Sequence, residues 1–267
     1  MIGFFRKIRK QLAADNMPLK YTRYAIGEIV LVVIGILIAL QINNWNEERV
    51  IKDNINLYLG TLIQDMRGDV NIIESGRRYH IFRIHSGIYM LNQYNPNEEL
   101  TLLPDNSNLP AWEDPSWRWK GPIPTTYNAD FIYTSLIWLF RYQPTDPNRR
   151  TFDEFSSTGL FSKMENHALK IKIENYYNYF EWMHSSSDKG YNPTVLWNKS
   201  LVASGIGYLD LANLEDPIEV IFSDKSRRAI LKNMIDESIY MSTSDQGLLG
   251  NLEEVIKEIE AEIQRNH

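Results

Sequence analysis

The stretch YAIGEIVLVVIGILIALQINNW, residues 24 to 45, decides how this chain is organised. Ten large aliphatic residues lie between positions 29 and 40, and Glu28 and Gln41 are the polar residues of the eighteen-residue run 25–42. A helix needs about 18 apolar residues to cross a bilayer. The aliphatic residues favour insertion by about 3 to 6 kcal/mol, and one acid near the edge costs about 3 kcal/mol or less. A buried helix of a soluble core is the alternative, but such helices seldom stay apolar on every face. We therefore predict a transmembrane helix.

The flanks of this run predict its depth and direction. Tyr21 and Tyr24 before it and Trp45 after it would lie at the two headgroup levels, because the helix rises about 32 Å from Tyr24 to Trp45. Basic residues precede the run, namely Arg6, Lys7, Arg9, Lys10, Lys20 and Arg23. Since Glu47 and Glu48 follow it, the positive-inside rule places the N-terminus in the cytoplasm. A cleaved signal peptide is the alternative, but no small-x-small site follows, so we expect an uncleaved signal anchor over residues 18–45.

Residues 1–17 are expected to form a basic amphipathic cytoplasmic arm. Apolar residues recur there at helical spacing, and the basic residues fill the opposite side, so the arm would lie on the anionic inner leaflet of the bilayer. A disordered basic tail is the alternative. The formal net charge of the whole chain is −6 although this arm is basic, so the remainder is strongly acidic. An acidic surface repels phosphate backbones, which argues against nucleic acid as a partner.

Residues 46–267 are predicted to form an all-α extracytoplasmic helical domain. No proline occurs from Trp45 to about Asn92, and apolar residues recur there at helical spacing, so the membrane helix should continue outward, with Gly76 as a point where it can break. Six prolines predict an irregular aromatic loop at 94–128. Further elements are expected in the remaining chain: helices at 129–142, 151–158, 162–184 and 194–211, an extended piece at 217–222, and helices from 223 to about 243 and from about 245 onward. The helix at 162–184 is predicted to carry one apolar side made by Leu169, Ile173, Tyr176, Phe180 and Met183. Asn192 and Pro193 should open the helix at 194–211, and Ser223 should cap the helix that follows the extended piece. The last helix carries an apolar stripe suited to packing against the first, which completes a bundle.

The sequence resembles a known family at three places, which read FFRKIRKQL at 4–12, YAIGEIVLVVIGILIALQINNWNEE at 24–48 and TFDEFSSTGLFSKMEN at 151–166. The family is an uncharacterised one of single-span bacterial membrane proteins, catalogued as a domain of unknown function. The likeness is specific over residues 4–50, looser around 151–180 and weak elsewhere. It implies an inner-membrane anchor with a mostly helical exterior domain, and it brings no known activity, substrate or catalytic residue.

The sequence contains few groups of residues that suggest catalysis. With no cysteine, the chain has no disulfide, thiolate metal site or catalytic thiol. His80 and His85 are five residues apart and so lie on different helix faces, unlike a zinc-binding pair. Residues 105–114 place oxygen side chains at alternate positions but lack the central glycine of a calcium loop. Asp65 and Asp69 lie one turn apart and could act as an acid–base pair, although a solvated helix face is the simpler interpretation. Nucleotide-binding and nucleophile motifs are absent. We predict no metal, no cofactor and no enzymatic activity.

Two groups of residues remain as candidate sites. Trp112, Trp117 and Trp119 in the irregular loop could contact a sugar or a peptide, although a lid over the open end of the bundle is the simpler interpretation. Glu28 shares a helical face with Gly35, and Gly35 and Ala39 form a small-x-x-x-small pair where another membrane helix can approach. Glu28 would then meet a partner helix and take up protons there; the alternative is a shallow position near the headgroups. Arg23 points away from Glu28, so we expect no ion pair between these two residues.

These observations support three functional hypotheses. The first is a non-enzymatic, membrane-anchored helical module in the bacterial inner membrane. Its periplasmic domain would bind a partner, act as a scaffold or sense a ligand, and it would form a homo-oligomer or pair with another membrane protein. The second is an accessory subunit of a proton-driven membrane machine that uses Glu28. The third is a glycan- or peptide-binding module that acts through the tryptophan-rich loop.

Overall fold

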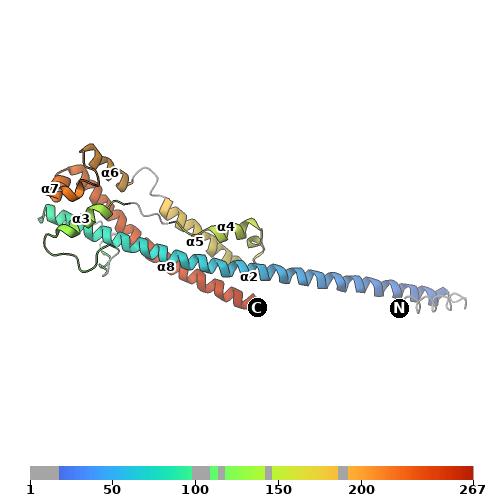
Figure 1. The fold of residues 1–267 in the computed structure, drawn as a ribbon. Coiled ribbons are helices and arrows are strands. Elements are labelled where there is room, and N and C mark those ends of the chain that lie inside the picture. Colours follow the sequence, from blue (N-terminus) through green and yellow to red (C-terminus); the bar gives the residue numbers. More distant parts are fainter. Residues whose placement is uncertain (1–17, 98–108, 114–117, 142–145, 186–191, 267) are drawn as a thin grey trace. The chain divides into compact units, whose positions relative to one another are not determined.

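The computed structural model of the chain is entirely helical in the part that it describes (Figure 1). The described residues are 18–97, 109–113, 118–141, 146–185 and 192–266. The elements in chain order are α2 (Pro18–Tyr94), α3 (Ala129–Trp138), α4 (Arg150–Ser157), η2 (Phe161–Lys163), α5 (His167–Ser185), α6 (Pro193–Ala203), η4 (Leu211–Asn213), α7 (Pro217–Phe222) and α8 (Lys225–Asn266). These described residues include no strand, which confirms the predicted all-α class.

The chain divides into two compact units, Met1–Asn56 and Leu57–His267. The described residues of the first unit belong to α2, and their large apolar side chains from Ile26 to Ile42 are exposed. The helix α2 continues into the second unit as the sequence predicted, and the helix is not interrupted at Gly76. Pro18 is the first residue of α2. A backbone N–H at this position has no partner within the helix, so proline, which lacks the N–H, costs no hydrogen bond there.

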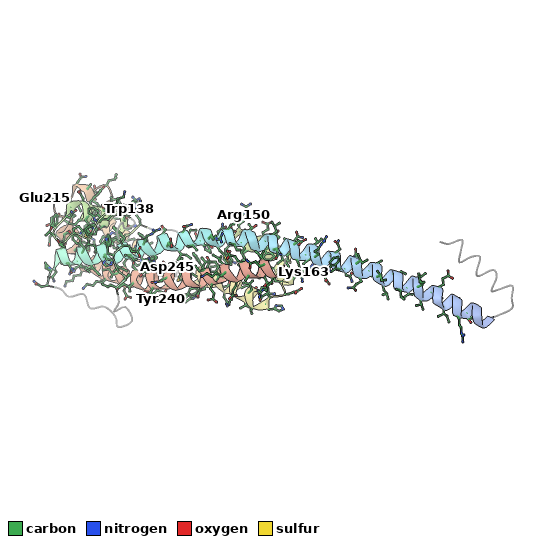
Figure 2. All side chains as sticks on the ribbon, turned by 90° about the horizontal axis from the view of Figure 1, so that it is seen from below. Trp138, Arg150, Lys163, Glu215, Tyr240 and Asp245 are labelled. Atoms are coloured by element: carbon green, nitrogen blue, oxygen red, sulfur yellow. The ribbon has the colours of Figure 1, made fainter. Side chains whose placement is uncertain are left out.

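In the second unit, the C-terminal part of α2 and the helix α8 lie side by side in both views (Figures 1 and 2). Arg67 of α2 pairs with Glu260 of α8 at 2.7 Å. The predicted interruption of the last helix near residue 244 is wrong, because α8 runs unbroken from Lys225 to Asn266, and its cap is Asp224 rather than the predicted Ser223. Burial of one continuous face against α2 and α5 outweighs the weak helix propensity of residues such as Gly247.

The helices α2 and α8 approach each other closely at Gly87. A Cβ atom built there would lie 2.8 Å from Cγ1 of Ile235 and 3.2 Å from Cδ1 of Leu231, both of which are fully buried. The glycine therefore allows the two helices to come closer than any other residue would. This contact is one of several that form the main core, in which α3, α6 and α7 surround the ends of α2 and α8.

We expect Gly87→Ala to lower the free energy of unfolding by about 1 to 2 kcal/mol. The added methyl group overpacks the helix contact at a cost of about 1 to 3 kcal/mol, which exceeds the helix-propensity gain of up to about 1 kcal/mol. Gly247→Ala is the matched control, because a Cβ there would meet no atom within 4 Å among the described residues, so only the propensity gain applies. Thermal unfolding of the full chain followed by circular dichroism measures both. Equal shifts for the two variants would contradict the close packing at Gly87.

The segment 217–222 is the short helix α7, so the prediction of an extended piece is wrong. The side chain of Asp216 accepts a hydrogen bond from the backbone N–H of Glu219 at 3.0 Å, and Pro217 occupies the first turn. An acidic cap followed by proline is a common helix start. The sequence therefore contains a local signal for this helix, although its β-branched residues Ile218, Val220 and Ile221 favour an extended chain.

The helix α6 starts at Pro193, as expected, and ends at Ala203 instead of near residue 211. Gly205 adopts a left-handed conformation with φ of 71°, and the N–H of Ile206 bonds to the carbonyl of Leu201. This six-to-one hydrogen bond across a left-handed glycine is the usual termination of a helix. The predicted end near residue 211 is therefore wrong, and α6 stops although apolar residues continue beyond Gly205.

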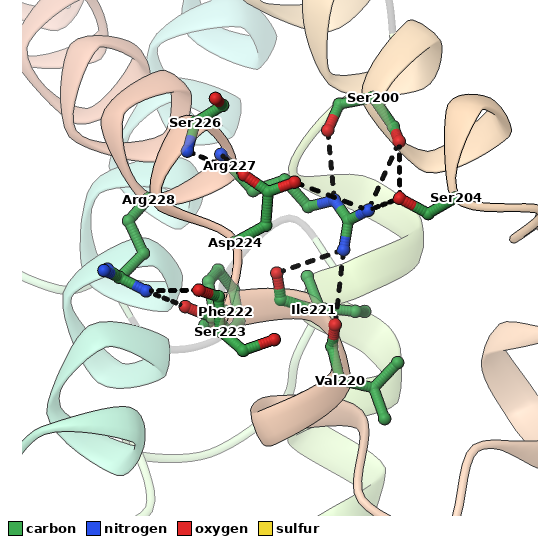
Figure 3. Close-up of polar contacts among 10 residues, drawn as sticks. All are labelled: Ser200, Ser204, Val220, Ile221, Phe222, Ser223, Asp224, Ser226, Arg227 and Arg228. Carbon is green, nitrogen blue, oxygen red and sulfur yellow. Dashed lines mark hydrogen bonds and ion pairs between the residues drawn. The ribbon is translucent and has the colours of Figure 1, made fainter.

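A buried guanidinium joins the ends of three helices (Figure 3). Arg227 in α8 is 2% exposed, and its side chain donates to the carbonyls of Val220 (3.2 Å) and Ile221 (3.3 Å) in α7. It also donates to the hydroxyl of Ser200 in α6 (3.0 Å), and Asp224 lies 3.8 Å away as its counter-charge. The last carbonyls of a helix lack partners within it, so Arg227 satisfies groups of α7 that would otherwise be buried unpaired.

Candidate functional site

The residues predicted to face a partner membrane helix, Glu28, Gly35 and Ala39, lie on one side of α2 in the first unit. Gly35 and Ala39 are exposed and Glu28 is partly buried. At about 100° per residue, Gly35 and Ala39 lie within about 20° of Glu28 on either side of it. A Cβ at Gly35 would meet no atom within 4 Å among the described residues. This side of α2 therefore has room for the backbone of another helix.

The two described tryptophans of the irregular loop contact the core. The ring of Trp112 lies edge-on to Phe131, and its Nε1 donates to the carbonyl of Gly121 at 3.1 Å. The ring of Trp119 lies edge-on to the same phenylalanine, with ring centroids 5.0 Å apart. Trp117 lies outside the described residues. Both described rings are partly buried, so their faces serve packing, and only part of each is available to a ligand.

The histidines His80 and His85 of α2 contact different groups. Nε2 of His85 lies 2.8 Å from the carbonyl oxygen of Pro110, and burial lowers the pKa of His85, while this hydrogen bond opposes the shift. The ring of His80 lies beside that of Tyr79, with centroids 5.8 Å apart. In the part of the chain that the structure describes, no group of three or more His, Asp or Glu side chains is arranged to hold a metal ion.

Asp65 and Asp69 do not form the solvated face that was expected. Asp69 is fully buried and accepts hydrogen bonds from the backbone N–H of Asn148 and the hydroxyl of Tyr176, both at 2.8 Å. Asp65 accepts from the side-chain amide of Asn148 at 2.8 Å and from the N–H of Thr151 at 3.3 Å. Burial raises the pKa of Asp69, and its two hydrogen bonds oppose the rise. The pair thus fastens the start of α4 and the helix α5 to α2.

Two further acids lie in α8 where it packs on α2. Asp245 has no exposed surface, and burial raises its pKa to about 7 against the opposing positive charge of Arg77. Burial also raises the pKa of Glu237, where the opposing charge is that of Arg83. Each acid of α8 therefore has an arginine of α2 near it, in an interface that is otherwise largely apolar.

A groove of about 320 Å³ lies between α5 and α8 in the second unit. The helix α5 contributes Lys172, Asn175, Tyr176 and Tyr179, and α8 contributes Leu248, Asn251, Glu254 and Val255. The floor is apolar, since Leu248 and Val255 are buried. At one end Lys172 bridges Glu254, at 2.7 Å, and Glu258. The ring of Tyr176 lines the groove while its hydroxyl is held by Asp69 beneath. We regard this groove as the candidate binding site of the second unit.

One part of the chain matches a known protein family. Residues 28–80 match a family described as a family of unknown function (DUF6090). The matched residues all belong to α2, so they include Glu28, Gly35 and Ala39 of the first unit and the acid pair Asp65 and Asp69. They include none of the groove residues in α5 and α8. A search of curated proteins and a search of solved structures each found no significant match.

Sequence reasoning missed the groove, although a signal for it was present in α5. The buried stripe predicted there is confirmed by Leu169, Ile173, Tyr176, Phe180 and Met183. Beside it runs a second stripe at helical spacing, in which the polar residues Lys172 and Asn175 are followed by the exposed aromatic residues Tyr179 and Trp182, and the first three of these line the groove. Exposed aromatic residues outside the core stripe are uncommon, and this second stripe could have identified the groove wall.

Proposed function

We propose that this protein is a non-enzymatic, membrane-anchored helical module whose second unit works on the periplasmic side of a bacterial inner membrane. The observation that carries the proposal is an 18-residue window of α2 with a mean hydropathy of 2.6, none of which is buried. This is compatible with a membrane anchor, because apolar side chains on all sides of a helix need an apolar solvent. The basic residues before the window and the acidic ones after it support the orientation.

We further propose that the module self-associates along α2. The side that carries Glu28, Gly35 and Ala39 has room for a second helix, as the open space at Gly35 indicates. In lipid, helices associate where small residues let their backbones approach closely. A second copy of this chain would bring the same surface, so the contact would be symmetric.

Crosslinking of the full chain in native membranes tests this proposal. We expect a crosslinked dimer or higher oligomer for the unchanged protein and a several-fold smaller oligomer fraction for Gly35→Leu, because the larger side chain keeps the two backbones apart. Gly27→Leu is the matched control, since residue 27 lies about 80° around the helix from residue 35. Only monomers in the unchanged protein, with no co-purifying membrane protein, would contradict both the self-association and the partner-binding proposals.

The role of Glu28 separates this proposal from that of a proton-driven accessory subunit. An acid in an apolar helix is costly and often marks a proton or ion path, which supports the second proposal. We expect Glu28→Gln to leave the crosslinked fraction unchanged if the acid only sets the depth of the helix. A loss of proton-driven activity in cells that carry Glu28→Gln, with assembly intact, would favour the accessory subunit instead.

A further inference from the structure

An aromatic platform on α5 begins in the groove between α5 and α8 and extends along the helix beyond it. Tyr179, which lines the groove, is 38% exposed, and Trp182, one turn further along α5 and outside the lining residues, is 57% exposed. Their ring centroids are 5.8 Å apart and the ring planes are tilted by 31°, so they form one nearly continuous surface. Large aromatic rings are normally covered in a folded domain, and an exposed adjacent pair marks a contact surface.

Two carboxamides, those of Asn175 and Asn251, lie on opposite walls of the groove, one in α5 and the other in α8. Both residues are exposed, and neither carboxamide hydrogen-bonds to another described residue. Each carboxamide offers two donor hydrogens and one acceptor oxygen. The pair can therefore donate to one hydroxyl and accept from its neighbour, which suits a ligand with several hydroxyl groups.

The charges at the groove exclude one class of ligand. Lys172 lies between Glu254 and Glu258, so its positive charge is already compensated by two carboxylates. The two hydrogen bonds to these carboxylates raise the pKa of Lys172, although burial opposes the rise, so the ammonium stays charged and paired. A phosphate, sulfate or carboxylate ligand would meet a net negative end of the groove, whereas a neutral polar ligand would not be repelled.

We propose that this groove binds a neutral saccharide of one or two sugar units. The C–H face of a sugar ring would lie on Tyr179 and Trp182, and its hydroxyls would reach Asn175 and Asn251. The volume of about 320 Å³ lies at the small end of ligand pockets, which are about 300 to 1,000 Å³. A peptide fits less well, because the described residues offer no strand edge for an extended peptide and the floor has only two apolar anchors for a helical one. This site is separate from the tryptophan loop and is independent of the proposed self-association.

Titration of the full chain with neutral oligosaccharides tests the proposal. The protein is kept in a zwitterionic detergent without a sugar headgroup, since maltoside or glucoside detergents would compete for the groove. Isothermal titration with maltobiose, cellobiose and N,N′-diacetylchitobiose should reveal binding of at least one of them, and an oligoglucuronide of equal length should bind at least tenfold more weakly. No heat of binding for any neutral sugar at millimolar concentration would overturn the proposal, as would tighter binding of the oligoglucuronide.

Single substitutions locate the site. Tyr179→Ala and Asn251→Ala should each raise the Kd for the bound sugar at least tenfold. The first removes a ring on which the sugar lies, and the second removes a carboxamide that hydrogen-bonds to its hydroxyls. Tyr133→Ala is the control: this tyrosine is also exposed, and it lines a second groove of about 360 Å³ with Tyr127, Asp130 and Glu215. Circular dichroism and the unfolding temperature of each variant show that the fold is kept. Loss of binding in Tyr133→Ala with full binding in Tyr179→Ala would overturn the assignment to the α5–α8 groove.

Discussion

Replacing Arg227 by methionine is expected to lower the free energy of unfolding by about 3 to 5 kcal/mol, the largest effect of any single substitution proposed for this protein. The guanidinium is almost fully buried, and it donates to the carbonyl of Ser200 in α6 and to those of Val220 and Ile221 in α7. Methionine fills the volume of the side chain but donates no hydrogen bond. The carbonyls of Val220 and Ile221 would then lose this buried donor, and the carbonyl of Ser200 would keep only the hydroxyl of Ser204 at 3.3 Å. Asp224 would lose its counter-charge.

The measurement is the thermal unfolding of the full chain in a neutral detergent, followed by circular dichroism. For a unit of this size, we expect the unfolding temperature of Arg227→Met to fall by about 10 °C. The unfolding temperature of Arg227→Lys should lie between those of the unchanged protein and Arg227→Met. An ammonium group keeps the charge, but it cannot donate to three carbonyls in the directions that the planar guanidinium does. Arg265→Met is the matched control, since Arg265 forms an exposed i, i+3 pair with Glu262 that contributes little to stability. Equal unfolding temperatures for Arg227→Met and Arg265→Met would contradict the role of Arg227.

Replacing Asp245 by asparagine is expected to stabilise the protein at and above neutral pH by up to about 4 kcal/mol. Burial raises the pKa of Asp245 from 3.8 to about 7, so the folded state binds a proton more tightly than the unfolded state does. Stability from this group is therefore fully present below about pH 4 and is lost as the pH rises through 7. The neighbouring Glu237, whose pKa burial also raises, adds a change of the same sign. The positive charge of Arg77 opposes the rise in the pKa of Asp245, and that of Arg83 opposes the rise in the pKa of Glu237.

Unfolding curves at several pH values between 4 and 9 check this prediction. The unchanged protein should lose stability between pH 4 and 7, whereas Asp245→Asn should show a weaker dependence and a higher unfolding temperature at pH 8. The stabilisation by Asp245→Asn is smaller to the extent that Arg77 loses its attraction to the carboxylate of Asp245. Arg77 keeps its ion pair with Glu113 in the variant. Glu253→Gln is the control, because Glu253 is an exposed residue of the same helix and its replacement should change stability by less than about 0.5 kcal/mol. An identical pH dependence in Asp245→Asn and the unchanged protein would contradict the prediction.

Local sequence patterns were sufficient for most of the helical architecture. The apolar run from Ile29 to Leu40, the absence of proline before Asn92 and the spacing of apolar residues predicted α2, and the buried stripe of α5 was predicted residue by residue. Capping signals were also local, since the side chain of Asn192 accepts from the N–H of Val195 as the start of α6 requires. The errors fell where two local signals competed, as at Pro217, or where packing kept a helix continuous, as in the middle of α8.

The roles of the polar residues could not be predicted in the same way. Asp69 was expected to face solvent, yet it is buried because Tyr176, which is 107 positions further along the chain, packs over it and donates to it. The groove needs Tyr179 and Asn251 from two helices that no sequence pattern places together. The period of a helix reveals which residues share its apolar face, because that face depends on neighbours three or four positions apart. Whether a polar side chain is buried, paired or open to a ligand depends on a helix that arrives from elsewhere in the chain, so it follows only from the packing.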